Sequence, residues 1–400
     1  MQRLALFTTD SVTDMSSAQI EIQLIASLVA IACALPGTFL VLRKRAMISD
    51  AISHSILPGI AVGFIITQDL NSPLLIVLAA LTGVLTVVLV EFIQRTGLVK
   101  EDTAIGLVFP ALFSVGVILI AKIADDVHLD IDAVLLGELV FAPFNRVVVG
   151  GTDLGPKSLW VIGTILLITL TLLLLFFKEL KLSTFDGELA ATLGFSPLLL
   201  HYGLMTVSSV TIVGAFDAVG AVLVVALIIA PAASAYLLTD DLRRMLVLSC
   251  CFGVVAAIGG YWVSNLLDAS IAGSITTVLG VLFLLVFLFA PKRGIFSTML
   301  RERQQKLEVS LLVFLLHLKN HQEADERHVS HLQEHINWQK GQSERVLDLA
   351  TKNNLITVSD DIVDLTAKGQ QFTEEALSYI ITNKETAIEE LKGRYFLFRG

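Results

Sequence analysis

Charged residues are scarce in this sequence of 400 residues. They make up 16% of the chain, whereas soluble domains carry about 25%. Apolar residues make up 54%, and the mean hydropathy is +0.77. This balance excludes a soluble enzyme, a disordered scaffold and a small secreted domain. The sequence therefore predicts a polytopic membrane protein.

Cysteine is also rare, and the sequence lacks the motif that binds ATP phosphates. Cys33, Cys250 and Cys251 lie in apolar runs without C-x-x-C spacing, so neither a disulfide framework nor a thiolate metal site is expected. The first apolar run reaches full spanning length, so a cleavable signal is not expected either. The sequence has no G-x-x-x-x-G-K-[ST] motif to cradle ATP phosphates, and no enzymatic activity of its own is expected.

Long apolar runs dominate the first three quarters of the chain. About 20 residues, at 1.5 Å each, cross the hydrocarbon core as a helix. Nine such runs occur, at residues 22–42, 48–67, 73–93, 104–121, 158–177, 198–215, 217–238, 244–265 and 271–290. The sixth and seventh belong to one stretch whose only charged residue is Asp217, and we expect a tight reversal there between Gly214 and Gly220. Without that reversal the number of spans would be eight.

Lys and Arg residues in the short loops predict the orientation. With residues 1–21 outside, 11 of them lie in cytoplasmic loops and 4 in outside loops, as the positive-inside rule requires. The outside segment 122–157 carries an acidic group that either attracts cations or is a solvated loop. A short surface helix is expected at 131–140. The acidic group consists of Asp125, Asp126, His128, Asp130 and Asp132.

Two ionisable residues interrupt the second apolar run. Asp50 and His54 are four residues apart, so on a helix they share a face. Such residues within a span usually face a bundle interior or an aqueous path. Carboxylate and imidazole donors suit Mn(II), Fe(II) or Zn(II). The alternative is that Ser49 or Asp50 caps the helix and His54 is a hydrogen-bonded core residue.

Two further segments carry functional candidates. Asp217 is expected near the outer surface, where it either meets an arriving cation or is simply hydrated. On the cytoplasmic side, residues 185–197 have an acidic start and a Gly and a Pro as stop signals, which predicts a brief helix between two spans. This segment either docks another protein or is an ordinary connector.

Four blocks resemble one family. They are M-I-S-D-A-I-S-H-S-I-L-P-G at 47–59, E-D-T-A-I-G-L-V-F at 101–109, F-D-G-E-L-A-A-T-L-G at 185–194, and F-D-A-V-G-A-V-L-V-V-A-L-I-I-A-P-A-A-S-A-Y-L-L-T at 216–239. In this order they resemble the permease subunits of bacterial metal-ion ABC importers, which carry manganese, zinc or iron. The resemblance spans about residues 20–293, so we expect a transmembrane permease domain at 22–293.

The resemblance implies several roles. Asp50 and His54 would line the metal path, and the segment at 185–197 would be the coupling helix that seats in a separate cytoplasmic ABC ATPase. It also implies an extracytoplasmic metal-binding protein, a location in the bacterial inner membrane, and a transported manganese, zinc or iron ion, with no permanently bound cofactor. A second permease, identical or homologous, would complete the pathway. The coupling residues would be Phe185, Asp186, Glu188, Leu189, Ala190, Leu193 and Gly194.

The last hundred residues differ from the rest. Residues 300–400 hold 13 of the 28 basic and 16 of the 37 acidic residues, so a soluble domain is expected at 307–400, after a linker at 294–306. Its pattern predicts an α+β winged-helix plan. The predicted elements are three helices, within 307–318, at 327–336 and at 343–352, strands at 355–358 and 362–366, and a further helix from about 373.

The role of this tail remains open at the sequence level. The order N-N-L-I-T-V-S-D-D-I-V-D-L-T-A-K-G resembles the wing of metal-dependent repressors related to the diphtheria toxin repressor. DNA is not an expected partner, because the tail is acidic and its expected recognition helix offers only Arg345 and Lys352 as cations. A histidine group either binds metal or is solvated. It consists of His317, His321, His328, His331 and His335.

Three functions are therefore considered. The first is the permease of an ATP-driven importer of a divalent transition metal. The second is a secondary transporter in which Asp50, His54 and Asp217 relay protons. The third is a membrane-tethered, metal-responsive regulator whose winged helix reads DNA.

Overall fold

The fold is taken from a computed structural model that describes residues 17–68, 72–123, 139–149, 152–320, 328, 340–359 and 362–382. The chain divides into two compact units, residues 1–294 and 295–400. We call them the membrane unit and the tail unit, and each is described by itself.

The membrane unit contains nine stretches, among the described residues, that are long and apolar enough to cross a membrane. The prediction of nine spans, rather than eight, is therefore confirmed. The stretches are α1 (Ser17–Leu42), α2 (Met47–Ser55) with α3 (Leu57–Thr67), α4 (Pro73–Arg95), α5 (Glu101–Ile123), α7 (Lys157–Leu175), α10 (Pro197–Val219), α11 (Ala221–Leu238), α12 (Leu242–Leu267) and α13 (Ile271–Phe289).

Two local features differ from the sequence prediction. The second span is broken at Ile56 into α2 and α3, because Pro58 has no N–H to donate to the carbonyl of His54 one turn earlier. The reversal after α10 occurs at Gly220, whose φ of +80° suits glycine, and not at Asp217. Gly214 lies within α10, where its missing side chain makes room for Ile165 of α7.

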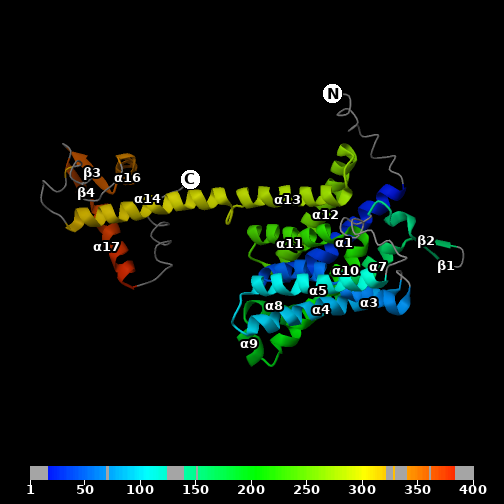
Figure 1. Cartoon of the computed structure of the whole chain (residues 1–400). Coiled ribbons are helices and arrows are strands. Elements are labelled where there is room, and N and C mark those ends of the chain that lie inside the picture. Colours follow the sequence, from blue (N-terminus) through cyan, green and yellow to red (C-terminus); the bar gives the residue numbers. More distant parts are fainter. Residues whose placement is uncertain are drawn as a thin grey trace. The chain divides into compact units, whose positions relative to one another are not determined.

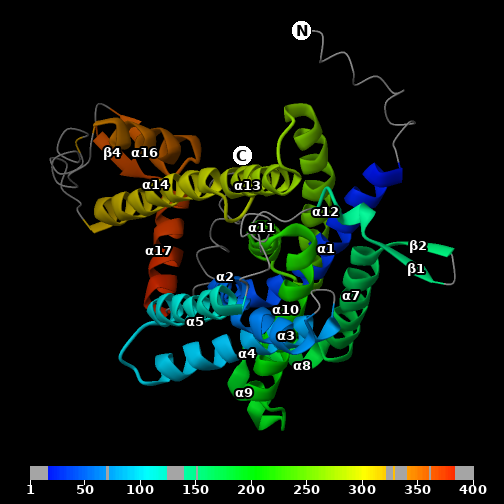
Figure 2. The ribbon, with the colours of Figure 1, turned by 45° about the vertical axis from the view of Figure 1, so that its right-hand side comes forward.

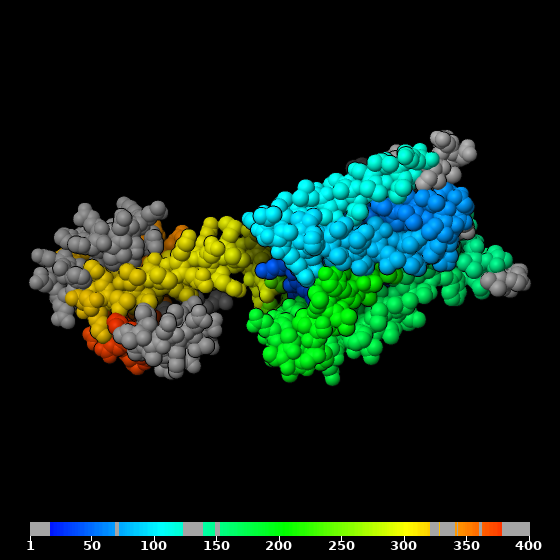
Figure 3. All heavy atoms as spheres, turned by 60° about the horizontal axis from the view of Figure 1, so that its bottom comes forward, coloured from blue at the N-terminus to red at the C-terminus, as the bar shows by residue number. Residues whose placement is uncertain are grey.

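Small residues hold the helices of the membrane unit at close range. A Cβ at Gly37 of α1 would clash with the backbone carbonyl of Ile228 in α11, and one at Gly83 of α4 would clash with Ser209 of α10. Glycine at such contacts allows the close backbone approach that drives helix association in lipid. In Figure 3 the light blue and cyan band of α3, α4 and α5 accordingly lies directly against the green band of α7 to α10.

Shorter elements mark the two ends of the helical bundle. At one end, α8 (Phe177–Phe185) and α9 (Gly187–Thr192) follow α7. At the other lie the 3-10 turn η3 (Ala142–Phe144) and an antiparallel hairpin of β1 (Arg146–Val149) and β2 (Thr152–Pro156), as Figures 1 and 2 both show. Arg146 ties this hairpin together through Asp153 and reaches Glu21 of α1.

Two sequence expectations fall at the outer end of the bundle. The hairpin was not predicted from the sequence. The acidic group at 125–132, and all but the last two residues of the expected surface helix at 131–140, lie outside the described residues. Those last two residues, 139 and 140, form a turn.

The described part of the tail unit packs three helices and a pair of strands around its own apolar core. The elements are α14 (Ile295–Asn320), α16 (Lys340–Lys352), β3 (Ile356–Ser359), β4 (Ile362–Leu365) and α17 (Ala367–Thr382). The helix predicted at 327–336 lies outside the described residues, except for His328. The strands pair antiparallel with Ile356 opposite Leu365, as the two predicted strands require. Phe314, Leu315, Val346, Val363 and Phe372 form the centre of the core.

Two boundaries in the tail differ from the prediction. The expected linker at 294–306 is instead the first half of α14, which runs unbroken from Ile295 because its Gln-, Arg- and Lys-rich sequence favours helix. The last helix begins at Ala367, six residues before the expected start. Of the five tail histidines, His321, His331 and His335 lie outside the described residues, and His328 forms an isolated bridge with Ile362 of β4.

Candidate functional site

Asp50 and His54 form a loose pair on α2. The carboxylate Oδ1 and the imidazole Nε2 are 3.5 Å apart, and the two side chains are 38% and 35% exposed. The ring of His54 lies 5.9 Å from the ring of Phe109 in α5, tilted by 39°. Both donor groups are therefore close enough to share one ligand, and neither is enclosed by the membrane unit.

The opposite side of α2 is buried. Its inward residues are Ile48, Ser49, Ile52, Ser53 and Ser55. The hydroxyl of Ser55 lies 2.6 Å from that of Thr86 in α4, and Ser53 donates to the carbonyl of Ser49. Because these inward contacts fix the rotation of α2, Asp50 and His54 face away from the core of their own chain.

The helix-cap alternative for this segment is wrong. The N-cap of α2 is Ala46, which has no side chain to accept a hydrogen bond, and the hydroxyl of Ser49 donates to the carbonyl of Ala46. Asp50 lies inside the first turn. His54 is half-buried against Phe109 and Asp50, so it is not an enclosed core histidine either.

The break after α2 adds a backbone contribution. The last carbonyls of a helix lack intrahelical partners and carry partial negative charge. His54 lies in the last turn of α2, two residues before the break at Ile56. The C-terminal end of this half-helix therefore makes its surroundings favourable for a cation, as at the broken helices of many transporters.

Asp217 lies apart from the pair. It is exposed in the last turn of α10, whereas His201 in the first turn of α10 contacts the end of the bundle where α2 begins. Asp217 and His201 are about 24 Å apart along α10, at 1.5 Å per residue. Asp217 therefore lies far from the end of the bundle where α2 begins. Among the described residues, no group of three or more His, Cys, Asp or Glu side chains converges. The structure therefore brings together Asp50 and His54 but not Asp217.

The segment at 185–197 forms the expected brief helix. Asp186 caps α9 by accepting from the backbone N–H of Leu189 at 2.9 Å, and Gly194, at a φ of +87°, ends the segment. Phe185, Leu189 and Leu193 are exposed, as is Glu188, whereas Ala190 is buried. Exposed apolar side chains on a polar loop are typical of a surface that docks another protein.

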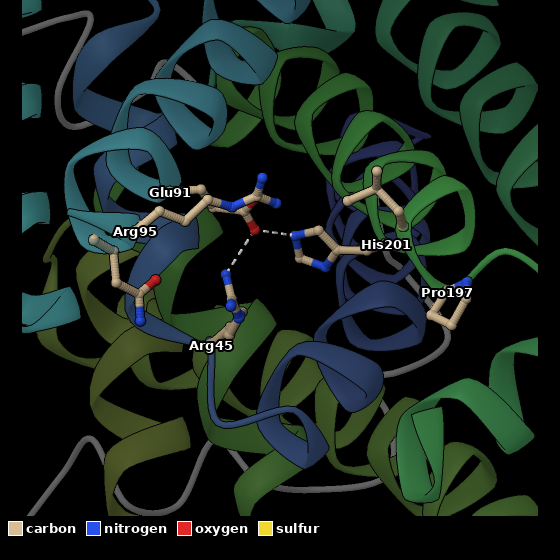
Figure 4. A pocket seen from close by; sticks show the side chains of 7 residues that line it. Arg45, Glu91, Arg95, Pro197 and His201 are labelled. Atoms are coloured by element: carbon tan, nitrogen blue, oxygen red, sulfur yellow. Dashed lines mark hydrogen bonds and ion pairs between the residues drawn. The ribbon is translucent and has the colours of Figure 1, made fainter. Parts of the chain in front are cut away.

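A second polar cluster lies near this segment, and the sequence reasoning missed it. Glu91 in the last turns of α4 is 7% exposed. Its carboxylate accepts from Arg45 at 2.9 Å and from Tyr202 at 2.8 Å, and lies 2.6 Å from Nε2 of His201, which is 13% exposed. Figure 4 shows this carboxylate pointing between Arg45 and His201. We call Glu91, Arg45, His201 and Tyr202 the Glu91 cluster.

Arg43 extends the Glu91 cluster toward the brief helix. Its guanidinium donates to Thr184 and Ser183 at the end of α8, at 3.1 and 3.3 Å, and lies 3.4 Å from Nδ1 of His201. Burial, followed by the nearby charge of Arg45, lowers the pKa of Arg43. A guanidinium still remains charged at neutral pH.

A cavity of about 510 Å³ lies beside the Glu91 cluster. It is lined by Arg45, Glu91, Gln94, Arg95, Pro197, Leu198 and His201, five of which are labelled in Figure 4. A sequence signal for the cluster existed. Glu91 is the only charged residue of the expected span at 73–93, and His201 lies at the start of the expected span at 198–215, both at predicted cytoplasmic ends.

Comparison with known proteins gives the family. The model of the ABC 3 transport family matches residues 17–290. A zinc transport system membrane protein, TroD of Treponema pallidum (strain Nichols), is 47% identical over 361 residues, covering 89% of this chain and 98% of its own. A manganese transport system membrane protein, MntD of Bacillus subtilis (strain 168), is 44% identical over 281 residues, covering 70% of this chain and 95% of its own.

A solved structure supports the same assignment. PsaBC from Streptococcus pneumoniae in complex with Fab contains a chain that is 29% identical, with a TM-score of 0.60, covering 71% of this chain and 95% of that one. The family model covers all nine candidate spans described in the membrane unit. The chain therefore belongs to the ABC 3 transport family.

Proposed function

We propose that this protein is the membrane-spanning permease of an ATP-driven importer of a divalent transition metal, and that Asp50 and His54 line the metal path. The observation that carries this proposal is a half-exposed carboxylate and imidazole on a broken spanning helix. Relatives are named as zinc and manganese transport proteins. Oxygen and imidazole donors suit zinc, manganese and iron alike.

The geometry suits a station on a path better than a storage site. A dication loses hydration that is worth many kcal/mol on entering an apolar region, so a path through the bundle needs donors. Ions must also leave, so binding at each station has to be weak. Two protein donors and the negative end of α2 meet both requirements.

One chain offers only part of a metal coordination sphere. Asp50 and His54 face away from their own core, so a second permease against this side would bring two more donors to the same place. Two-fold closure is the common solution for such assemblies. The partner is an identical or a homologous permease, and four donors would complete a four-coordinate site.

Energy and cargo come from separate proteins. The chain has no phosphate-cradling motif, so a cytoplasmic ABC ATPase supplies ATP hydrolysis. The surface that docks it is α9 with the exposed side chains of Leu189 and of Phe185 and Leu193 on either side of the helix. An extracytoplasmic metal-binding protein delivers the ion to the opposite end of the bundle. Asp217 and the β1–β2 hairpin lie near that end.

The secondary-transporter hypothesis is disfavoured. A proton relay requires groups within reach of one another, directly or through water. Asp217 lies in the last turn of α10, far along the helix from the end where α2 begins. Membership of the ABC 3 transport family favours ATP-driven transport for the same chain.

For the tail unit we propose a cytoplasmic, winged-helix-like regulatory domain. Its support is the order helix, helix, strand pair, helix, with His328 bridging β4 as an additional strand position. DNA remains an unfavoured partner, because Lys352 of the expected recognition helix is paired with Asp348 at 2.7 Å. The match to TroD covers 361 residues, which is longer than the membrane unit, so it extends into the tail unit. The match to MntD covers 95% of MntD in only 281 residues, so MntD has no counterpart to most of the tail unit.

Deleting residues 295–400 tests the proposal for the tail. The chain should be shortened after Gly294, where the two units divide. A chain that ended near residue 306 would stop inside α14. Metal uptake should persist while its response to cytoplasmic metal changes. Failure of the shortened chain to insert and assemble would make the tail a structural part of the transporter.

Uptake of radiolabelled manganese and zinc by cells tests the main proposal. Asp50→Asn removes the charge at nearly constant volume, and His54→Phe removes the donor nitrogens but keeps a ring. Both variants should lose uptake at equal membrane abundance. Ser53→Ala is the matched control, since Ser53 faces inward on the same helix and bonds only to its own backbone turn. Wild-type uptake by the Asp50 and His54 double variant would contradict the proposal.

A further inference from the structure

The Glu91 cluster joins three segments that are distant in the sequence. Glu91 belongs to α4, His201 and Tyr202 to the first turn of α10, and Arg45 to the turn that connects α1 with α2. Removing these charges from water is costly unless every group finds a partner. Three partners on one carboxylate fix the relative positions of α4, α10 and the start of α2.

Arg43 connects a fourth segment, α8, to this network. The guanidinium of Arg43 lies 3.4 Å from Nδ1 of His201, and Nε2 of the same ring lies 2.6 Å from the carboxylate of Glu91. The same guanidinium holds Ser183 and Thr184, which lie just before Asp186, the cap of α9. A continuous chain of polar contacts therefore runs from the end of α8, through Arg43 and His201, to Glu91.

The chain of contacts ends at the helix that carries the metal donors. Arg43 and Arg45 belong to one tight turn, in which Lys44 has a φ of +58° and the backbone N–H of Arg45 bonds to the carbonyl of Leu40. The helix α2 begins two residues after Arg45, so Asp50 is little more than one helical turn away. Because α2 ends at the Ile56 break, it is a short rigid piece that can tilt separately from α3.

We propose that Glu91, Arg43, Arg45 and His201 are positioning residues that transmit movement of α8 and α9 to α2, and thereby shift Asp50 and His54 when the ATPase hydrolyses ATP. The inference rests on the proposed function, because it assumes that an ATPase moves α9. The cavity of about 510 Å³ beside the cluster gives Arg45 and His201 room to shift without opening the packed core.

The same contacts argue against the Glu91 cluster as a second metal site. Its carboxylate already accepts from Arg45 and Tyr202 and lies 3.8 Å from Arg95. A dication would have to displace two arginines that repel it. The half-exposed Asp50 and His54 have no arginine among the contacts that the structure describes for them.

The test uses the full transporter in proteoliposomes, with its ATPase and metal-binding protein. Two quantities are measured, namely metal ions imported per ATP hydrolysed and the metal affinity of the ATP-free complex. Glu91→Gln should lower the first by about five-fold and leave the second unchanged. Arg43→Gln should do the same, since it cuts the contacts to α8 and keeps the Glu91–Arg45 pair. Arg95→Gln, at an exposed side chain, is the control and should match wild type.

Each outcome separates the two proposals. If wild type imports metal and both cluster variants keep its import per ATP, the coupling inference fails and the transport proposal stands. If the variants lose metal affinity in proportion to import, the cluster belongs to the metal path and the inference fails as well. If wild type does not import metal at all, the proposed function fails. Should Glu91→Gln not assemble, the Arg43→Gln result decides.

Discussion

Among its described residues, the membrane unit contains two carboxylate–imidazole pairs with opposite surroundings. Asp50 and His54 are 3.5 Å apart, more than a third exposed, and have no other charged side chain within ion-pair distance among the described residues. Glu91 and His201 are 2.6 Å apart, nearly buried, and accompanied by Arg45, Arg95 and Tyr202. A carboxylate and an imidazole thus occur together once with free capacity to bind a ligand and once with that capacity used.

This difference separates a site for a ligand from a structural junction. A carboxylate that already accepts several hydrogen bonds gains little from a cation, whereas removing it leaves buried partners unsatisfied. A loosely paired, half-exposed carboxylate costs the fold little when it is removed, and gains a partner when a cation arrives. Stability measurements on the two pairs should therefore give contrasting results.

The largest effect on stability is expected at Glu91. Glu91→Leu leaves Arg45, His201 and Tyr202 without their acceptor, and breaking a buried pair in this way costs about 3–5 kcal/mol. The matched change Asp50→Leu should cost far less. Thermal unfolding of both variants in the same detergent, together with membrane abundance, measures the contrast. Equal losses at the two positions would remove the distinction on which the comparison rests.

A smaller loss is expected from Tyr202→Phe. This change deletes one hydrogen bond of 2.8 Å to the Glu91 carboxylate and keeps the ring that lies against His201. A hydrogen bond to a charged group contributes about 1.5–3 kcal/mol, so the unfolding temperature should fall measurably but less than for Glu91→Leu. Unchanged stability would mean that the carboxylate is held by its ionic partners alone.

Arg95→Gln should have almost no effect on stability. Arg95 is 67% exposed and lies 3.8 Å from the carboxylate, and exposed ion pairs contribute about 0–1 kcal/mol. The same thermal assay should place this variant within error of wild type. A loss as large as that of Tyr202→Phe would show that the outer arginine belongs to the cluster proper.

The smallest effect concerns Asp240, an exposed ion pair outside the spans. Hydrogen bonding to Lys292, followed by the charges of Arg293 and Lys292, lowers the pKa of Asp240 below its ordinary value of about 3.9. A lowered pKa contributes stability at pH values above that ordinary value, and this stability is lost as the pH falls through the folded pKa. Asp240→Asn should therefore differ from wild type only slightly at neutral pH, and the difference should vanish in acid.

The sequence predicted much of the fold, because apolar length and loop charge are strong signals. The nine spans, the two tail strands and the brief helix at 185–197 follow from such local patterns. The break at Ile56 depends on one proline inside an apolar run that reads as a continuous helix, and so it was missed.

The candidate site was only partly predictable, because spacing in the sequence reveals contacts within one helix but not contacts between distant segments. Asp50 and His54 lie one turn apart, so their spacing alone suggests a shared face. The Glu91 cluster joins α4, α10 and the turn before α2, and no local spacing reveals contacts between residues more than a hundred positions apart. Glu91 and His201 stand out in hindsight as lone polar residues at the ends of spans.

X-ray absorption spectroscopy of zinc bound to the full ATP-free transporter tests the central claim most directly. If Asp50 and His54 hold the ion, the spectrum should show nitrogen and oxygen neighbours at about 2.0–2.2 Å and the outer-shell scattering of an imidazole ring. The imidazole contribution should fall in His54→Phe and remain unchanged in His201→Gln. An imidazole signal that is unchanged in His54→Phe and falls in His201→Gln would contradict the account.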